Sequence, residues 1–500
     1  MHLGKRSNHP HPLDRRTLVV CAVVMIGGVM SILDMTVVNV ALDRLTVEFD
    51  ASFSTVQWVV TGYTLALAAV IPVTGWASDR FGMKRIYIGA VAAFTLGSVL
   101  CALAWSLGSL IAFRVLQGAG GGMVLPVITT IVTRQAGPHR RGRVMGILGV
   151  PLLAAPVFGP ILGGWLVDAV SWRAVFLINL PVGLVAMALA QVVLDRDRPQ
   201  PGHRLDWLGM ALLSPGLTLM IFGFAESPAH GFGAVRTWLP ILIGAALIAA
   251  FLVHSWRSPV PLIDVRTFVH TRAGAAAATV LLLSAGLFGV LLMVPVYFQV
   301  ARGTSALESG LLLAPQGVGA MVAMPIAGWL ADRHGPFWLP ACGVPFAIVG
   351  TVPFTLLTAT TPFALLCAFN VLVGFGLGIA FMPAMTAAMN SVPERAIART
   401  STAMNILDQA GASIGAAVLS VVLAAALPQA MGAGGIDAVS GLGDGRRAAL
   451  AAPLADAFST VFTWALAGLI ASMVPALLLA RHRRGARLPV GQGPQLAERA

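Results

Sequence analysis

Long apolar segments follow one another along nearly the whole chain, and they constrain its fold more than any other feature. A membrane-spanning α-helix needs about 20 predominantly apolar residues, and fourteen runs approach or exceed that length. They lie at 17–42, 55–77, 86–104, 108–132, 143–167, 174–194, 206–225, 237–255, 274–299, 309–331, 337–358, 362–385, 399–427 and 457–480. The chain is 57% hydrophobic and 10% charged, whereas soluble domains are about 25% charged. The sequence therefore predicts an all-α polytopic membrane protein with 14 transmembrane helices.

Polar segments divide these runs into groups of six, two and six. The predicted parts are a cytoplasmic tail (1–16), a six-helix half (17–194), two central helices with flanking loops (195–272), a second six-helix half (273–480) and a cytoplasmic tail (481–500). Residues 428–456, rich in glycine and alanine, are expected to form an extracytoplasmic loop. The first apolar run is too long for a signal-peptide core, so we expect it to remain as the first helix.

Basic residues are distributed unevenly between the two sides of the predicted bundle. With the N-terminus inside, inner segments hold 25 of the 32 lysines and arginines, and outer segments hold six. The positive-inside rule then places both termini in the cytoplasm and the protein in the cytoplasmic membrane. The same distribution explains the net charge of +12 without a nucleic-acid partner. The four cysteines show no metal-ligand spacing, so neither a disulfide nor a metal site is expected.

An internal repeat links the two six-helix halves. The octet GWASDRFG at 75–82 closes the second run of the first half, and GWLADRHG at 328–335 closes the second run of the last half. Five of the eight positions match, at an offset of 253 residues. Equivalent motifs at equivalent helix ends are typical of transporters that are built from repeated halves.

Residues 146–164, GILGVPLLAAPVFGPILGG, combine an apolar composition with five glycines and three prolines. Proline removes a backbone donor and bends a helix, and a membrane helix tolerates this because its neighbours satisfy the freed groups. Small residues let a second backbone approach closely. The stretch therefore predicts a kinked, tightly packed membrane helix that bends or seals. A plain packing face of small residues is the alternative interpretation.

Several motifs, taken in order, give the chain a family resemblance. They are LDMTVVNVAL at 33–42, GWASDRFGMKR at 75–85, LIAFRVLQGAGGG at 110–122, SWRAVFLINLPVG at 171–183, and YFQ at 297–299 followed by GTS at 303–305. Together they resemble the major facilitator superfamily, and within it the fourteen-helix drug:proton antiporter branch. Asp43 stands where that branch usually has a proline. The resemblance implies the major facilitator fold, with two six-helix halves and two extra central helices.

The resemblance also implies roles for two motifs. The helix at 146–164 resembles the antiporter motif of exporters, carried here by Gly149, Pro156, Gly159, Pro160, Gly163 and Gly164. The loop motif locks the inner side of the family's transporters in the outward-open state. That gating role is assigned to Gly75, Asp79, Arg80, Gly82 and Arg85, with Asp332 and Arg333 in the repeat. Because Asp79 ends a helix, where the dipole disfavours negative charge, it needs cationic or helix-N-terminal neighbours.

Three charged residues lie inside predicted spans. Asp34 and Arg114 are each about 10 Å from the outer ends of their helices, at 1.5 Å per residue, so their depths permit a pair. A charge at mid-helix costs about 2.5–3.5 kcal/mol. We predict that Asp34 binds a proton or a cation and that Arg114 tunes the pKa of the Asp34 carboxyl group. The alternative is a static ion pair that holds the first and fourth helices together. Asp408 is predicted to be a second site that binds a proton or a charged group of the substrate. The alternatives are that it pairs with the loop motif on the inner side, or that it is simply exposed to solvent.

Polar side chains inside other spans are candidates for lining a substrate cavity. They are Asn39, Gln57, Trp58, Tyr63, Gln117, Gln299, Asn370 and Asn405. Methionine and phenylalanine are plentiful, but they pack more often than they bind, and none is assigned as a ligand.

The leading hypothesis is a proton-coupled antiporter that exports small amphipathic drugs or antibiotics by alternating access. Asp34 and Asp408 weakly favour cationic substrates. The alternative is a dedicated exporter of one endogenous metabolite or self-made antibiotic. An uptake symporter, a membrane sensor and an intramembrane enzyme are less favoured. The sequence has neither an H-E-x-x-H motif nor a Walker P-loop, so no enzyme activity, metal or cofactor is predicted.

Overall fold

The computed structural model describes residues 14–137, 140–195, 205–231, 233–269, 271–427 and 444–481, and these form helices and connecting turns without a strand. The first half contains α1 (Arg15–Glu48), α2 (Phe53–Val56), α3 (Trp58–Val70), α4 (Thr74–Phe81), α5 (Met83–Ala102), α6 (Leu107–Ala136), α7 (Arg141–Ala169), α8 (Ala174–Leu177) and α9 (Asn179–Val193). A 3-10 turn, Ile71–Val73, joins α3 to α4 in one span. The central helices are α10 (Trp207–His230) and α11 (Val235–Arg257).

The second half has the same plan. It contains α12 (Arg272–Val296), α13 (Ala306–His334), α14 (Leu339–Thr351), α15 (Phe363–Asn390), α16 (Ile397–Ala426) and α18 (Asp444–Arg481). A π-helical segment, Tyr297–Ala301, extends α12. Short 3-10 turns extend α14 at both ends (Pro336–Trp338 and Val352–Leu356) and precede α16 (Glu394–Ala396).

The predicted fold class is confirmed. Within the described residues, thirteen helices are long and apolar enough to cross a membrane, and α7, with 29 residues, is a further long helix. Each matches one of the fourteen predicted runs. Two predicted boundaries differ most from the structure. Helix α1 runs to Glu48 and not to 42. Residues 444–456, assigned to a loop, form the start of α18, so that helix begins well before position 457. The rest of that predicted loop, 428–443, lies outside the described residues, as do most of both predicted tails.

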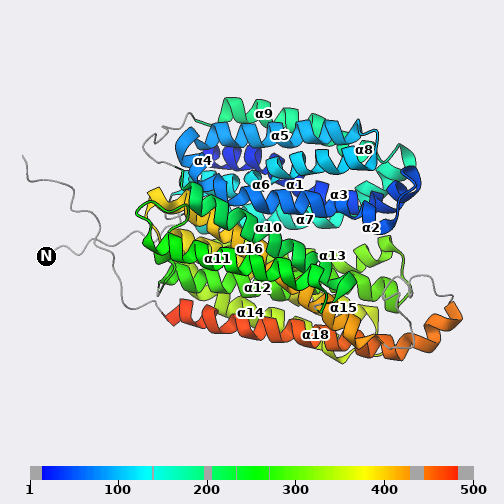
Figure 1. Ribbon diagram of the computed structural model, residues 1–500. Helices are drawn as coiled ribbons and strands as arrows, with labels where there is room; N and C mark the ends of the chain where they lie inside the picture. The colour runs from blue at the N-terminus through cyan, green and yellow to red at the C-terminus, as the bar shows by residue number, and fades with distance from the viewer. Residues whose placement is uncertain are drawn as a thin grey trace, which may run out of the picture.

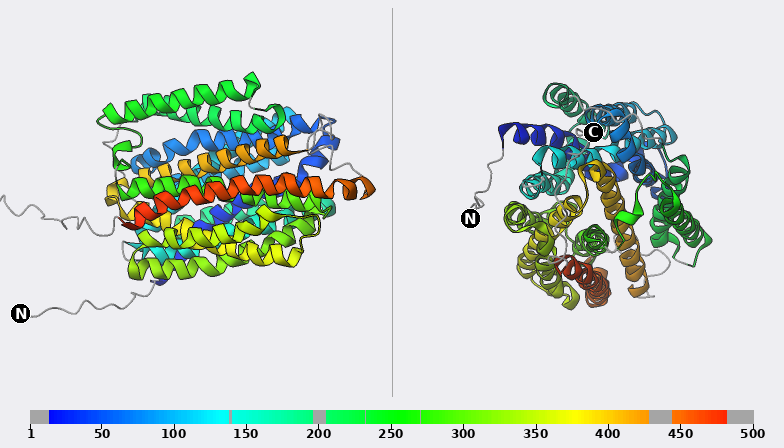
Figure 2. Two further views of the ribbon diagram at one scale, coloured as in Figure 1. Left: turned by 90° about the horizontal axis from the view of Figure 1, so that it is seen from below. Right: turned by 90° about the vertical axis from the view of Figure 1, so that its left-hand side faces the viewer.

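The two halves lie side by side, with their helices roughly parallel (Figure 1). Helix α10 packs against α3 of the first half and α16 of the second, and α11 packs on α10. The central helices thus cover one edge of the boundary between the halves (Figures 1 and 2). The start of α1 and the end of α18 lie at the same end of the bundle (Figure 1). We call this the N/C end, and the opposite one the far end.

Glycine at two equivalent positions reverses the chain at the N/C end. Gly82 ends α4 with φ of 90°, and Gly335 ends α13 with φ of 85°. Residues with a Cβ rarely adopt this left-handed region, whereas glycine does so at little steric cost. The two octets of the sequence repeat therefore end in the same backbone turn.

Candidate functional site

Asp34 and Arg114 form an ion pair in the interior of the first half. Arg114 Nη1 lies 2.6 Å from Asp34 Oδ2, and the two residues are 2% and 1% exposed. Asp34 comes from α1 and Arg114 from the third turn of α6, the two helices between which the sequence permitted a pair. Since a lone buried charge is costly, each group depends on the other.

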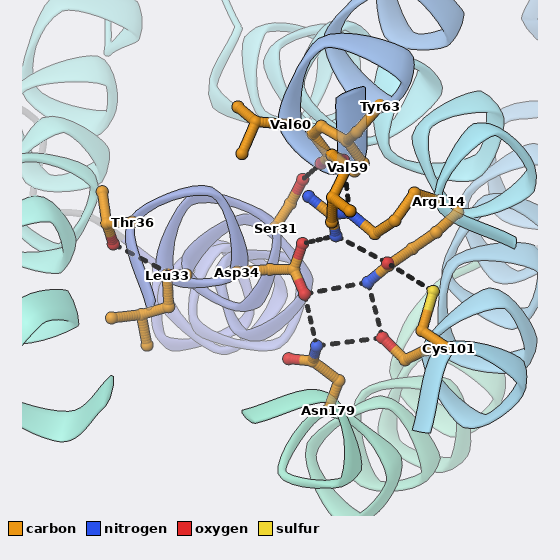
Figure 3. A network of polar contacts seen from close by, with 12 residues as sticks. Ser31, Leu33, Asp34, Thr36, Val59, Val60, Tyr63, Cys101, Arg114 and Asn179 are labelled. Atoms are coloured by element: carbon orange, nitrogen blue, oxygen red, sulfur yellow. Dashed lines mark hydrogen bonds and ion pairs between the residues drawn. The ribbon is translucent and has the colours of Figure 1, made fainter. Parts of the chain in front are cut away.

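Two amides complete the coordination of the Asp34 carboxylate (Figure 3). Gln117 Nε2 donates to Asp34 Oδ1 over 2.9 Å, and Asn179 Nδ2 donates to the same oxygen over 2.8 Å. Both amide nitrogens also donate to Ser98 Oγ on α5, over 2.6 and 2.9 Å. The network around this one carboxylate therefore joins side chains from α1, α5, α6 and α9.

The Arg114 guanidinium is also held by more than the carboxylate. Its Nε donates to the Val59 carbonyl over 3.2 Å, and its Nη1 donates to Gln117 Oε1 over 2.7 Å. The ring of Tyr63 lies beneath it, with the guanidinium carbon 4.1 Å from the ring centroid. A buried charge held by a full set of hydrogen bonds and an aromatic face is well compensated. In this conformation the pair is closed, and its opening requires a change in the protonation or the packing of Asp34.

Asp408 on α16 lies apart from this network. Its Oδ1 accepts a hydrogen bond from Ser284 Oγ of α12 over 2.6 Å, and its side chain is partly exposed. The loop-motif aspartates at the N/C end have other partners. Asp408 is thus an intramembrane carboxylate with a neutral hydrogen-bond donor, in contrast to Asp34.

Apart from Asn405 and Asn370, the candidate cavity residues divide into two groups. Tyr63 and Gln117 are buried parts of the Asp34 network and do not line open space. Asn39, Gln57, Trp58 and Gln299 are exposed, and Asn405 is half-buried with its amide bonded to the Ser401 carbonyl. The exposed group can meet solvent or lipid at the far half of the bundle.

The loop motif of the first half joins the two halves at the N/C end. Asp79 Oδ1 lies 3.3 Å from Arg134 of α6, and Asp79 Oδ2 lies 3.6 Å from Arg399 at the start of α16. A Cβ on Gly75 would lie 3.1 Å from Arg399 Cα, so glycine permits this close approach of α4 and α16. Arg80 is half-buried and Arg85 exposed.

The repeat motif makes the equivalent contact through backbone hydrogen bonds as well as an ion pair, with Arg143 Nε 3.8 Å from Asp332 Oδ2. Asp332 accepts hydrogen bonds from the backbone N–H groups of Gly142 and Arg143, over 2.8 and 3.2 Å. These are the first free donors of α7, so the carboxylate caps that helix and complements its dipole. Gly328 meets the Gly142 backbone, whereas Arg333 is exposed and stacks near Trp329. Both motifs therefore tie one half to the other at the N/C end.

The glycines of the antiporter motif pack closely, as small residues in membrane helices do. A Cβ on Gly149 would meet Met324 of α13, and one on Gly159 would meet Thr36 of α1. Gly163 lies against Val37 of α1, whereas a Cβ on Gly164 would meet nothing within 4 Å. Pro156 and Pro160 lie inside α7, which continues through them. The motif thus seats α7 between α1 and α13.

Sequence reasoning missed two members of the Asp34 network and one pattern. Asn179 lies in the motif SWRAVFLINLPVG, to which no role was assigned, and Ser98 carried no signal beyond its polarity in an apolar run.

The pentad GASIG at 411–415 matches the G-x-S-x-G pattern of serine hydrolases. It lies inside α16, where Gly411 and Gly415 pack on Leu281 and Ala285 of α12. A nucleophile elbow needs a strand-to-helix turn, which this helix does not provide.

The structure also reveals a second sequence repeat. FRVLQGAGGG at 113–122 on α6 corresponds to FNVLVGFGLG at 369–378 on α15. Gly118 packs on the Tyr63 carbonyl, and Gly374 packs on the Gln316 carbonyl in the same way. Asn370 therefore occupies the position of Arg114 in the second half. It is fully buried, and neither side-chain atom has a hydrogen-bond partner among the described residues.

No group of three or more histidine, cysteine, aspartate or glutamate side chains in the described ranges is placed to hold a metal ion. The chemistry available at the Asp34 site is therefore that of a carboxylate, a guanidinium and amides. Such groups can exchange a proton and can bind hydrogen-bond donors or cations.

Comparison with known proteins agrees with this architecture. The chain is 43% identical to the "Multidrug resistance protein B homolog" of Mycobacterium tuberculosis, over 96% of this chain and 94% of that protein. It is 31% identical to the "Tetracenomycin C resistance and export protein" of Streptomyces glaucescens, over 80% of this chain and 75% of that protein. The structure of the proton:xylose symporter XylE matches with a TM-score of 0.62 at 14% identity, covering 93% of this chain and 95% of XylE.

A family model also matches the chain from its first span to its thirteenth. The matching family is the Major Facilitator Superfamily, over residues 24–416. The match includes both loop motifs, the Asp34 network and Asp408. It agrees with the resemblance drawn from the motifs and with the fold of two six-helix halves. The chain belongs to the Major Facilitator Superfamily.

Proposed function

We propose that this protein is a proton-coupled antiporter that exports small amphipathic compounds across the cytoplasmic membrane. Membership of the superfamily makes it a transporter of small molecules and not an enzyme. The names of its relatives, which refer to multidrug resistance and to antibiotic export, support amphipathic drugs as its substrates. The excess of basic residues on one side supports cytoplasmic termini, so the N/C end would face the cytoplasm.

The observation that carries this proposal is the closed Asp34–Arg114 pair within the first half. An intramembrane carboxylate that is held by a guanidinium and two amides has two discrete states. Ionised, it holds α1, α6 and α9 together; protonated, it loses its charge-assisted bond to Arg114. Proton binding would thus change the packing of helices that surround the substrate path, which is what coupling requires.

The contacts at the N/C end support alternating access. Asp79, Asp332 and Ser401 join the halves there through side-chain contacts, including the 3.0 Å bond from Ser401 Oγ to the Pro126 carbonyl. With that end facing the cytoplasm, the structure corresponds to the state that is closed on the inside. Breaking these contacts would accompany the change to the inward-open state.

The experiment uses inside-out vesicles with an imposed pH gradient, with ethidium as a cationic compound and chloramphenicol as a neutral one. Wild type should accumulate at least one of them and release luminal protons. Asp34→Asn should lower both activities by about tenfold or more, because the amide cannot carry a proton. The matched control is Asp168→Asn, which changes an exposed carboxylate at the end of α7.

If Asp34→Asn still exchanges protons for substrate at the wild-type rate, Asp34 is a static helix tie and the coupling proposal is wrong. Loss of ethidium transport alone would assign Asp34 to cation recognition, and Asp408→Asn would then be tested for coupling. The name of the tetracenomycin exporter supports a second candidate, export of a single compound. Transport of one compound from a wide panel would favour that candidate over multidrug efflux.

A further inference from the structure

A long apolar groove runs along α1 in the first half. Its volume is about 630 Å³, and its lining extends along α1 from Leu18 to Val37, with α7 and the α8–α9 span forming the walls. At 1.5 Å per residue this segment of α1 is about 28 Å long. Helix α1 packs against both α7 and α9. All the residues that line the groove belong to the first half.

The groove opens toward the surface that a bilayer would cover. Large apolar side chains on the adjoining helices are exposed, including Phe158 and Trp165 on α7 (60% and 61%) and Leu184 on α9 (54%). The start of α1 lies at the rim of the bundle in the end-on view (Figure 2). In a membrane protein, exposed apolar faces of this kind contact lipid. A molecule dissolved in the bilayer can reach the groove from the side.

At the end opposite Leu18, the groove reaches the Asp34 network. Asn179 lines it, and the amide nitrogen of Asn179 is committed to Asp34 and Ser98. Because a carboxylate only accepts hydrogen bonds, the nitrogen must face Asp34 and the oxygen must face away. Within the described residues Asn179 Oδ1 accepts no hydrogen bond, and no dashed line reaches it in Figure 3. The groove thus ends at an acceptor that a ligand can use.

We propose that this groove binds an amphipathic compound from the bilayer, with its apolar body along α1 and a hydrogen-bond donor, such as an amine, on Asn179 Oδ1. Its volume and its apolar lining with a few convergent polar groups are those of small-molecule sites. A donor on Asn179 Oδ1 and the Asp34 carboxylate on Asn179 Nδ2 would then share one amide, so occupancy of the groove is linked to the carboxylate. The inference rests on the proposed function only in making this compound a transport substrate; binding itself is testable without transport.

The test measures binding of radiolabelled dodecylamine to the purified full-length protein in nanodiscs of neutral phospholipid. Ala22→Phe fills the groove from an exposed position on α1, and the matched control Ala188→Phe adds the same ring to the exposed face of α9, outside the lining. Ala22→Phe should weaken binding about tenfold, since it displaces roughly two buried methylenes. Ala188→Phe should bind within about twofold of wild type.

A second comparison tests the polar end. Dodecyltrimethylammonium has the same chain and charge as protonated dodecylamine but no donor, so it should bind wild type about fivefold more weakly, the loss of one hydrogen bond. Val182→Phe, which fills the groove from α9, guards against a folding defect in Ala22→Phe, and thermal unfolding is compared for all variants.

Equal binding of dodecylamine by wild type, Ala22→Phe and Val182→Phe would overturn the proposal. If wild type also retains more phospholipid than these variants, the groove belongs to a membrane lipid instead. Binding that follows the predicted pattern in a protein that transports neither ethidium nor chloramphenicol would uphold the site and count against the proposed function.

Discussion

The two six-helix halves share a backbone plan but treat buried polarity in opposite ways. In the first half, Arg114 is paired with Asp34 and surrounded by donors and acceptors. In the second half the equivalent position holds Asn370, whose amide is fully buried without a partner in the described structure. Gln316, the counterpart of Tyr63, likewise has an unpartnered side-chain oxygen. Helix α12, the counterpart of α1, carries no acidic residue.

The two halves share the glycine contacts that pack their helices, but they differ in their buried polar groups. The glycines that bring α6 against α3 and α5 recur where α15 meets α13 and α14: Gly120 packs on Phe94, and Gly376 packs on Ala347. The polar residues of the two segments differ: Arg114 and Gln117 are replaced by Asn370 and Val373. The repeat therefore preserved the helix contacts, whereas the ion pair is confined to the first half. Three predictions test this reading, in order of expected effect.

The largest effect is expected from breaking the ion pair on one side only. Asp34→Leu or Arg114→Leu leaves an uncompensated buried charge, which should lower the free energy of unfolding by about 3–5 kcal/mol. The double variant should lose much less than the sum of the two. Thermal unfolding in detergent for all four proteins measures this coupling. Additive losses would show that the two charges do not depend on each other.

A smaller and equal effect is expected from the matched glycines Gly118 and Gly374. A Cβ at either would press on a backbone carbonyl, of Tyr63 or of Gln316, so alanine should cost about 1–3 kcal/mol through overpacking. The control Gly89→Ala, where a Cβ meets nothing within 4 Å, should be neutral or slightly stabilising. The unfolding temperatures of the three variants test this prediction. If Gly118→Ala lowered stability and Gly374→Ala did not, the two glycines would not be packed equally closely.

The smallest effect is expected at Asn370. Replacing a buried amide that has no partner removes an unpaid desolvation cost, so Asn370→Leu should unfold within about 1 kcal/mol of wild type, or be more stable. The matched change Gln117→Leu breaks bonds to Asp34, Arg114 and Ser98 and should cost about 1–3 kcal/mol. Unfolding midpoints in the same detergent compare the two. A loss at Asn370 as large as that at Gln117 would mean that bound water satisfies this amide.

Much of the architecture could be predicted from the sequence because it depends on properties local to one helix. The length of each apolar run determines a span, and the octets predicted the repeat whose glycines both turn with positive φ. Counting residues along two helices suggested a pair between Asp34 and Arg114, and the pair forms, although α1 ends at Glu48 and not at 42, so Asp34 lies farther from its helix end than Arg114 does. The need of Asp79 for cationic neighbours followed from its place at a helix end, and Arg134 and Arg399 lie there.

What only the tertiary structure decided is which helix faces which, and at what rotation. Spacing along a helix gives the depth of a side chain but not its neighbour, so Gln117 looked like a cavity residue and lies instead in the Asp34 network. Asn179 joins that network from α9, although the sequence places it 145 residues from Asp34. The cap that Asp332 forms on α7, the unpartnered amide of Asn370 and the groove along α1 likewise arise from the close packing of helices distant in sequence.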